Sequence, residues 1–335
     1  MSGRAGASHP QEIHSVSRRA FLAAVAVGCT AATTAFPAPA QRRFFAGHGL
    51  PIGLQLYTLG QEPYRDLDGT LRAVSKIGYR TVEGVGFMKR RAAEFRAALD
   101  RARLSCPSTH VPLGADSSGG PSLAGDLGPL AADMHRVGVK YVVVPIFVVP
   151  QRLGGPLAGE DGLAFLSRAG KQMTADDWRR LAAQLNAKGA ALKREGLKLG
   201  YHNHNVELTR LGSKTALDLL LENTDPGLVW FEMDVGWVAA GGAEPIQLLR
   251  AHPHRFRLMH IKDLKASTVP NSAFRMDPAD VGSGTLKWKA ILPVGYDAGV
   301  RYYYVEQEPP FAEPRMQAAR TDYEYLARLP ATAGQ

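Results

Sequence analysis

The sequence predicts an α/β protein of the (β/α)₈, or TIM-barrel, class that follows a cleavable signal segment. After residue 45, eight short apolar or β-branched runs alternate with segments of helical periodicity. The runs are not alternately polar, which is typical of parallel strands buried on both faces. A doubly wound open sheet would need a glycine fingerprint after its first strand, and residues 57–60 (Tyr-Thr-Leu-Gly) do not supply one. Eight βα units therefore favour a closed barrel.

The first 45 residues are interpreted as a signal peptide with its linker, and the barrel is expected over residues 46–335. Residues 17–22 (Ser-Arg-Arg-Ala-Phe-Leu) match a twin-arginine signal, an Ala-rich apolar stretch follows, and residues 38–40 (Ala-Pro-Ala) offer a cleavage site. The apolar stretch is too short for a comfortable membrane span. Export to the periplasm is expected, with lipid attachment at Cys29 as the alternative.

Charge and cysteine content exclude two classes of protein. The chain carries a formal net charge of +9, but its Lys and Arg residues are scattered and form no basic block. No nucleic-acid footprint is therefore expected. There are two cysteines, and Cys106 has no partner once Cys29 leaves with the signal. A disulfide framework is excluded for the same reason.

The first half of the barrel is assigned from its apolar runs and the breaks between them. Gly78 follows a stretch of helical spacing and is typical of a helix end. Residues 114–128 are rich in Gly, Ser and Asp, which indicates a loop, and the Gly-rich connection 151–170 is expected to be lid-like or mobile. The expected strands are 51–57, 79–83, 104–110 and 141–146, and the expected helices are 67–77, 89–103 and 130–137.

The second half is assigned in the same way. Thr174 with Asp177 three residues later resembles a capping box and starts a long helix. Pro245 is typical of a first helical residue. The expected strands are 199–205, 228–234, 256–262 and 302–306, and the expected helices are 174–194, 214–222, 245–252, 286–292 and 314–329.

The strand ends carry the residues that indicate chemistry. In an extended strand, residues two apart share a face, so His202 and His204 are expected to project together. A barrel gathers the carboxyl ends of its strands at one site. Mixed histidine and carboxylate ligands suit Mn²⁺, Zn²⁺, Co²⁺ or Fe²⁺, whereas Mg²⁺ prefers oxygen alone. The other strand-end residues are Glu83, His110, Asp234, His260, Lys262, Glu306 and Glu308.

Five motifs carry a resemblance to a known family. They are 199–204 (LGYHNH), 231–237 (FEMDVGW), 258–263 (LMHIKD), 281–284 (VGSG) and 304–307 (YVEQ). On these motifs, residues 52–329 resemble the xylose isomerase-like sugar phosphate isomerase/epimerase superfamily, and more closely its exported twin-arginine branch. The motifs are specific for the superfamily and say little about the substrate.

The resemblance implies a divalent metal site with ligands on successive late strands. Asp234, His260 and Glu306 fall at the family's Asp, His and final Glu. At the family's first Glu this chain has His202, although His204 is an alternative ligand there. Family epimerases use two glutamates on opposite faces of the substrate, so the change to histidine favours a one-base reaction.

The remaining roles are assigned with their alternatives. The expected proton acceptor is Glu306, with Glu308, His202 or His204 in the same role. The expected substrate-binding residues are His110, Glu83, Trp237, Lys262 and Glu308. Structural roles compete for three of them: an ion pair for Glu83, a pair with Asp263 for Lys262, and plain packing for Trp237.

Three functions follow as hypotheses. The first is a metal-dependent isomerase or epimerase that removes the proton next to a carbonyl, on a non-phosphorylated sugar or derivative because sugar phosphates are mainly cytoplasmic. The second is a lyase or hydratase that acts on 3-keto-glycosides by β-elimination. The third is a non-catalytic periplasmic sugar-binding barrel. The expected partner is a small-molecule sugar, with no membrane span in the mature form, and the sequence is compatible with a homodimer.

Overall fold

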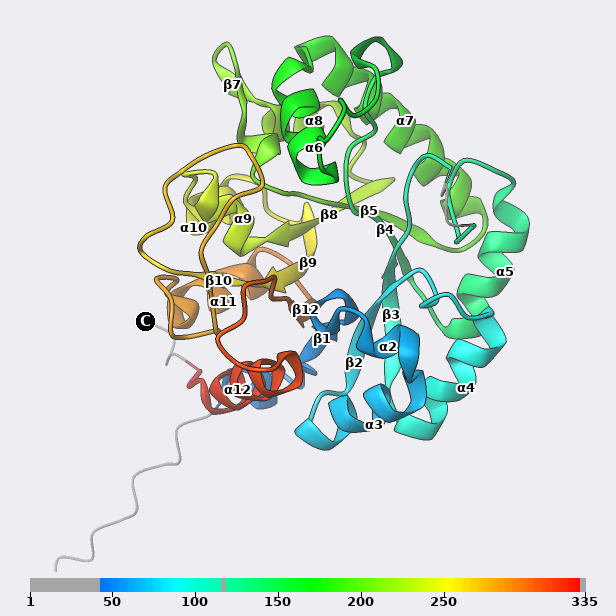
Figure 1. The fold of residues 1–335 in the computed structure, drawn as a ribbon, viewed down its shortest axis with the longest axis vertical. Coiled ribbons are helices and arrows are strands. Elements are labelled where there is room, and N and C mark those ends of the chain that lie inside the picture. Colours follow the sequence, from blue (N-terminus) through cyan, green and yellow to red (C-terminus); the bar gives the residue numbers. More distant parts are fainter. Residues whose placement is uncertain (1–42, 116–118, 332–335) are drawn as a thin grey trace, which may run out of the picture. The chain divides into compact units, whose positions relative to one another are not determined.

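The computed structural model describes residues 43–115 and 119–331, and its centre is a closed barrel of parallel strands. Around the barrel the strands follow one another in chain order, and the last pairs with the first. Figure 1 shows the helices outside this ring of strands. The predicted TIM barrel is confirmed. Its strands are β1 (Gly53–Gln55), β2 (Thr81–Val85), β3 (Ser105–His110), β4 (Tyr141–Val144), β5 (Lys198–His202), β8 (Val229–Asp234), β9 (Phe256–Ile261) and β12 (Tyr302–Val305).

The outer helices begin and end where local chemistry directs them. Asp66 accepts a hydrogen bond from Gly69 N at the start of the first one, and Gly78 ends it with φ 133°. Thr174 and Asp177 form the predicted capping box. These helices are α3 (Leu67–Ile77), α4 (Ala92–Ala102), α5 (Leu127–Val137), α7 (Ala175–Arg194), α8 (Ala216–Asn223), α10 (Pro245–Ala251), α11 (Trp288–Asp297) and α12 (Arg315–Arg328).

Two helices and two strand ends differ from the expectation. Helix α6 (Gly162–Gln172) lies inside the predicted lid-like connection, where the Asp161 side chain caps it at Ala164 N. Helix α9 (Val235–Ala240) begins directly after β8, in a stretch to which the sequence analysis assigned no element. Strand β1 gives way after three residues to the 3₁₀ turn η1 (Leu56–Leu59), and β5 ends at His202.

Short elements complete the described part of the chain. Two hairpins stand outside the barrel sheet. The elements are α1 (Phe44–Gly47), α2 (Glu62–Arg65), η2 (Gln151–Leu153), η3 (Val206–Leu208), the hairpin of β6 (Arg210–Leu211) with β7 (Lys214–Thr215), and the hairpin of β10 (Asp263–Leu264) with β11 (Pro278–Ala279).

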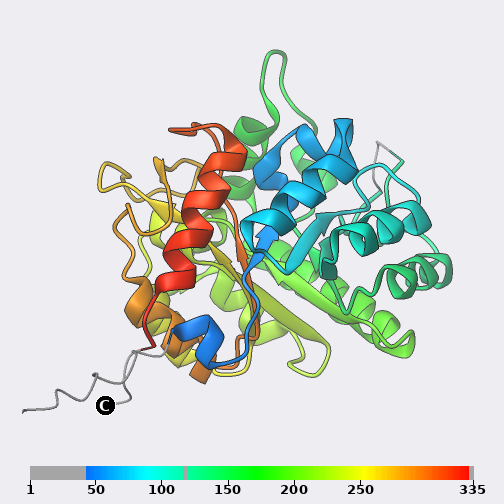
Figure 2. The same cartoon turned by 90° about the horizontal axis from the view of Figure 1, so that it is seen from below.

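The described chain begins inside the fold. Phe44 and Phe45, which the sequence assigns to the linker, are buried, and both rings meet Tyr303 edge to face. Phe44 N also donates to Leu329 O at 2.8 Å. Figure 2 shows α1 beside the end of α12. The predicted twin-arginine signal, cleavage site and Cys29 lie outside the described residues.

Within the described ranges, none of the helices combines the length and the apolar character that crossing a bilayer requires.

The inside of the barrel is divided into two layers. Towards the amino ends of the strands, the side chains of Tyr141, Val143, Leu258 and Tyr304 form a small core of their own, separate from the large core between strands and helices. Towards the carboxyl ends, the inward side chains are polar and equally buried. The change of layer takes one step of two residues along a strand, as from Leu258 to His260 on β9.

Candidate active site

The carboxyl ends of β5, β8, β9 and β12 bring four predicted ligands together. One donor atom from each of His202, Asp234, His260 and Glu306 lies within 4.8 Å of the other three. His260 Nδ1 is 2.9 Å from Glu306 Oε2 and 3.8 Å from Asp234 Oδ2. His202 Nε2 is 4.0 Å from Asp234 Oδ2. We call these four residues the upper cluster.

The two carboxylate oxygens of Asp234, at the end of β8, make different contacts. Its Oδ1 accepts from Trp237 N at 2.8 Å and so caps α9, which explains why a helix follows the strand without a loop. Its Oδ2 is sealed from solvent and, among the described residues, accepts no hydrogen bond of good geometry, although Lys262 Nζ lies 2.9 Å away. Burial raises the pKa of the Asp234 carboxyl to about 6, against the opposing effect of Lys262.

Beneath the upper cluster lies a second set of buried polar side chains: Glu83, His110 and Glu232. We call these three residues the lower layer. His110 Nε2 is 2.9 Å from Glu232 Oε2 and 3.3 Å from Glu83 Oε2. Burial opposes charge on His110, but the two carboxylates outweigh it and raise its pKa to about 9. Glu83 therefore forms the ion pair that was considered as its structural role, with His110 as partner.

Glu232 is the functional candidate that the sequence analysis missed. It is fully buried, and its Oε2 lies 3.1 Å from His202 Nδ1 and 3.1 Å from His260 Nε2. A signal was available in the sequence. Glu232 precedes Asp234 by two residues, so a strand that turns Asp234 inward turns Glu232 inward as well.

Lys262 lies against the upper cluster rather than beside its sequence neighbour. Its Nζ is 2.9 Å from Asp234 Oδ2, 2.8 Å from Glu306 Oε2 and 2.6 Å from Glu308 Oε1. Burial works against the ammonium charge, but these carboxylates hold the pKa of Lys262 well above its usual range. Glu308 is thereby tied to the site through Lys262.

The alternative pairing of Lys262 with Asp263 is wrong. Asp263 faces the other way and accepts from Gly282 N at 2.9 Å and from Trp288 Nε1 at 2.8 Å. Adjacent residues of an extended segment point to opposite sides, which separates the two side chains.

His204 reaches the site by a different route from the one predicted. Strand β5 ends at His202, and the next turn is fixed by the buried Glu207, which accepts from His204 N at 2.9 Å and from Tyr201 Oη at 2.6 Å. The rings of His202 and His204 nevertheless lie 4.8 Å apart. Burial, with Lys262 next in weight, lowers the pKa of His204 to about 3, so its imidazole is neutral at neutral pH.

Trp237 is a wall of the site. It is 2% exposed, and Lys262 Nζ lies 4.9 Å from its ring centroid. Its other neighbours are His204 at 5.6 Å and Phe274 at 6.2 Å between ring centroids. This packing leaves little of the indole face for a stacked sugar ring.

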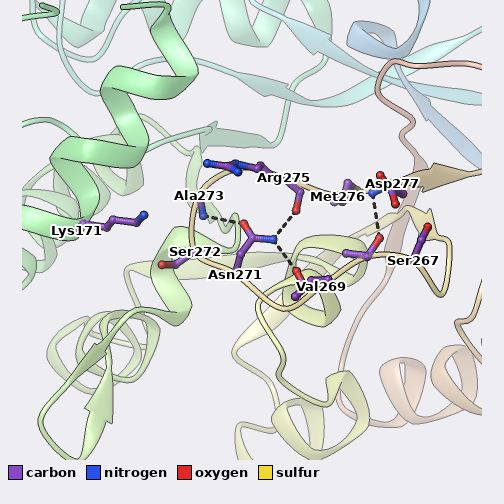
Figure 3. A pocket seen from close by; sticks show the side chains of 10 residues that line it. Lys171, Ser267, Val269, Asn271, Ser272, Ala273, Arg275, Met276 and Asp277 are labelled. Atoms are coloured by element: carbon purple, nitrogen blue, oxygen red, sulfur yellow. Dashed lines mark hydrogen bonds between the residues drawn. The ribbon is translucent and has the colours of Figure 1, made fainter.

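The loop that carries Phe274 also borders a cleft of about 520 Å³ that none of the predicted site residues lines. Figure 3 shows Asn271 bracing this loop through hydrogen bonds with Val269 O, Ala273 N and Arg275 O, while Lys171 of α6 stands on the opposite wall. Asn205 Oδ1 in turn accepts from Phe274 N at 3.0 Å. The polar segment after β5 thus holds Phe274 against His204.

The upper cluster has the composition of a transition-metal site. Two imidazole nitrogens and two carboxylate oxygens converge, which suits Mn²⁺, Zn²⁺, Co²⁺ or Fe²⁺. The sealed Oδ2 of Asp234 is an oxygen that a cation would satisfy. The residues therefore fit a divalent ion, and the identity of that ion is not fixed by them.

Curated proteins similar to this chain include inosose dehydratases. The one from Geobacillus kaustophilus is 25% identical over 227 residues, which cover 68% of this chain and 70% of that protein. The one from Clostridium tetani is 34% identical over 96 residues, covering 29% of this chain and 32% of that protein. For the Bacillus anthracis relative the match spans 62% of its length, so the chain covers less than two thirds of several of these relatives.

Solved structures similar to this one include a sugar phosphate isomerase/epimerase from Parabacteroides distasonis. Its TM-score is 0.65 at 25% identity, over 84% of this chain and 99% of that chain. A 3-keto-D-glucoside 4-epimerase from E. coli superposes with a TM-score of 0.55 at 17% identity, over 83% of this chain and 98% of that one. The second likeness concerns the fold alone.

A family model described as xylose isomerase-like TIM barrel matches residues 71–329, most of the barrel. The match includes all four residues of the upper cluster. This chain belongs to the xylose isomerase-like TIM barrel family.

Proposed function

We propose that this protein is a divalent-metal-dependent enzyme that removes the proton next to the carbonyl of a non-phosphorylated sugar or sugar derivative, as an isomerase or epimerase does. The observation that carries the proposal is the convergence of two imidazoles and two carboxylates in the upper cluster. An ion held by His202, Asp234, His260 and Glu306 would polarise the carbonyl and offset the negative charge that develops on its oxygen.

Glu306 is the residue that we assign to proton removal. Its contacts with His260 and Lys262 use Oε2, and no hydrogen bond from a described residue uses Oε1. One carboxylate can therefore contribute a ligand oxygen and keep the other for the substrate. Burial opposes its ionisation, but Lys262 and His260 hold the pKa of Glu306 well below its usual range, so the carboxylate is ionised at neutral pH.

Lys262 and His204 complete the set of groups around the reacting carbons. The three donors of the Lys262 ammonium face three carboxylates, so Lys262 can donate to a substrate oxygen when one of these contacts, such as that with Glu308, gives way. His204 Nδ1 is buried without a hydrogen-bond partner, and its neutral ring is a second acceptor. Glu306 has no matching carboxylate at the position of His202, which favours one-base chemistry over transfer between two opposite faces.

The product depends on where the electrons of the broken C–H bond go. If the proton returns from Glu306 to the neighbouring carbon, the result is isomerisation of a ketose and an aldose. If a group leaves from the β-carbon, the same electron pair forms a C=C bond and the result is elimination. The similarity to inosose dehydratases favours this second candidate, a dehydratase or 3-keto-glycoside lyase.

The test is exchange of the α-proton with solvent deuterium in a panel of ketoses, inososes and 3-keto-glucosides, read by mass spectrometry. The Mn²⁺-loaded protein is expected to incorporate deuterium, and Asp234→Asn is expected not to, although asparagine can still cap α9 through its Oδ1. Asp322→Asn is the matched control, since Asp322 is a buried carboxyl of α12 that accepts from Val281 N and belongs to neither the upper cluster nor the lower layer.

The products separate the two candidates, since isomerisation conserves the sugar's composition and elimination releases water or the aglycone. Metal and sugar binding without deuterium uptake would leave a sugar-binding barrel in place of the enzyme. Uptake that persists unchanged in Asp234→Asn would remove the metal from the mechanism.

We also propose that the protein works outside the cytoplasm, on the basis of residues 17–22 and the apolar stretch that follows. Fusion of residues 1–45 to a folded reporter is expected to deliver it to the periplasm in a host with twin-arginine translocation. Replacing Arg18 and Arg19 by lysine is expected to retain the reporter inside. A reporter that stays inside with both arginines intact would contradict this assignment.

A further inference from the structure

The lower layer is not used by the proposed chemistry, yet its carboxylates contact both histidines of the upper cluster. Glu83 and Glu232 are fully buried, and each has one oxygen, Oε1, that is sealed without a hydrogen-bond partner. All their contacts run through Oε2. Burying two carboxylates is unfavourable unless each accepts hydrogen bonds. The donors that they contact are therefore considered next.

His202 is held from below by Glu232. Its Nδ1 lies 3.1 Å from Glu232 Oε2, whereas its Nε2 faces Asp234 in the upper cluster. Since a carboxylate only accepts, Nδ1 must carry a proton in this contact. In a neutral ring the other nitrogen, Nε2, then holds the lone pair.

His260 is held in the opposite sense by Glu83. Its Nε2 lies 2.6 Å from Glu83 Oε2, whereas its Nδ1 faces Glu306 and Asp234. By the same argument Nε2 carries a proton. Nδ1 also meets a carboxylate, that of Glu306, so an ion in the upper cluster would displace the proton on Nδ1 and leave Nε2 protonated. Gln55 Nε2 donates to the same Glu83 oxygen at 2.8 Å and fixes the carboxylate in this pose.

A second set of donors, His110, His202, Glu232 and His260, is also close enough to hold an ion. It would use His202 Nδ1 and His260 Nε2, the nitrogens opposite to those of the upper cluster. A neutral imidazole has one lone pair, so two ions at once would require both rings to lose their last proton. The two sets are therefore mutually exclusive for neutral histidines.

We infer that Glu83 and Glu232 are positioning residues: Glu232 fixes His202 with Nδ1 protonated, Glu83 fixes His260 with Nε2 protonated, and the chain holds one ion, in the upper cluster. This inference rests on the metal site of the proposed function. Hydrogen bonds from ligand histidines to carboxylates orient the rings and raise their basicity. His110 links the two carboxylates and keeps them at a fixed separation.

The experiment uses the zinc-loaded full barrel chain with ¹⁵N-labelled histidine and no substrate. Ring-nitrogen NMR of the wild type is expected to show zinc on Nε2 of His202 and on Nδ1 of His260. Titration with Co²⁺, followed by its visible absorption, is expected to saturate at one ion per chain. Neither readout depends on turnover.

Two matched variants separate the two contacts. Glu83→Gln is expected to disturb the His260 pattern and leave His202. Glu232→Gln is expected to disturb His202 most and His260 less, because Glu232 Oε2 also lies 3.1 Å from His260 Nε2. Each is expected to weaken Co²⁺ binding by about 10- to 100-fold. Asp322→Asn, which also removes a buried carboxyl, is expected to change neither the NMR pattern nor the affinity.

Several results would overturn the inference. These are two Co²⁺ ions per chain, zinc on the opposite nitrogens, or variants that keep wild-type affinity and pattern. If the variants fail to fold, the wild-type NMR pattern decides alone.

The results also separate this inference from the proposed function. A wild type with the expected NMR pattern but no proton exchange would contradict only the proposed function. A wild type with the reversed pattern would contradict only the positioning role. A wild type that binds no metal would remove both.

Discussion

The two layers inside the barrel are built from the same strands and obey different rules. On β9, Leu258 lies in the apolar layer and His260 in the polar one, and on β12 the same step separates Tyr304 from Glu306. In the apolar layer, both tyrosine hydroxyls have a donor: Tyr304 Oη accepts from Ser108 Oγ at 2.9 Å, and Tyr141 Oη accepts from Lys198 Nζ at 3.5 Å. In the polar layer, the sealed Oε1 atoms of Glu83 and Glu232 have no hydrogen-bond partner among the described residues, and the nearest cation to Asp234 Oδ2 is Lys262 Nζ at 2.9 Å.

The difference shows which end of the barrel is optimised for stability and which for chemistry. Buried polar groups are normally satisfied, and an unsatisfied one costs about 1–3 kcal/mol. Two such oxygens within one site are therefore unfavourable for folding. The apolar layer, closed by Tyr141 and Tyr302 with ring centroids 5.3 Å apart, supplies the packing that tolerates this cost.

The largest effect on activity is expected when one predicted metal ligand of the polar layer is replaced. His260→Gln should reduce deuterium exchange to the background rate, because the ion loses a nitrogen donor and Glu306 loses its contact at 2.9 Å. Exchange is measured per folded molecule, with the folded fraction taken from circular dichroism. Substantial exchange in this variant would show that the upper cluster is not the reaction centre.

The next largest effect is expected on stability, when a residue of the apolar layer is truncated two residues earlier on the same strand. Leu258→Ala should lower the free energy of unfolding by about 2–5 kcal/mol, because Leu258 is fully buried and leaves a cavity. Urea unfolding measures the change. Metal affinity and exchange per folded molecule should stay near the wild-type values, and a parallel loss of both would mean that the layers are not separable.

Asp322, a buried carboxyl outside both layers, is expected to make the free energy of unfolding depend on pH. Burial raises the pKa of Asp322 to about 8, so the folded chain binds a proton that the unfolded chain, with a pKa of about 3.9, releases. Stability from this group is full below the unfolded pKa and is lost as pH rises towards 8. Unfolding titrations from pH 5 to 8 should therefore show a falling contribution in the wild type that Asp322→Asn lacks. If the free energy of unfolding changes with pH equally in the wild type and in Asp322→Asn, Asp322 is not the group that binds the proton.

The smallest expected effect concerns a helix start away from the barrel interior. Thr174→Ala removes the hydroxyl that accepts from Asp177 N and donates to Asp177 Oδ2. The expected loss is about 1 kcal/mol of unfolding free energy with no change in exchange. Thermal unfolding measures it, and a loss of activity in this variant would point to coupling between α7 and the site.

Much of the fold and part of the site were predictable because they depend on local periodicity. Helix α3 covers the expected residues 67–77, since its apolar spacing and Gly78 fix both ends. Helix α6 was missed because glycine-rich sequence conceals a short helix that begins at the Asp161 cap. Glu232 was missed although its spacing from Asp234 was visible, because a buried carboxylate beneath a site has no sequence signature of its own.

The sequence by itself determined the alternation of strands and helices, the family, and the residue types at the strand ends, because these follow from chemical character along the chain. The tertiary structure alone decided that Lys262 meets Asp234 and Glu306 rather than Asp263, and that Glu83 on the second strand reaches His260 on the seventh. Such contacts join residues far apart in the chain, and closure of the barrel sets their distances. For that reason no local pattern records them.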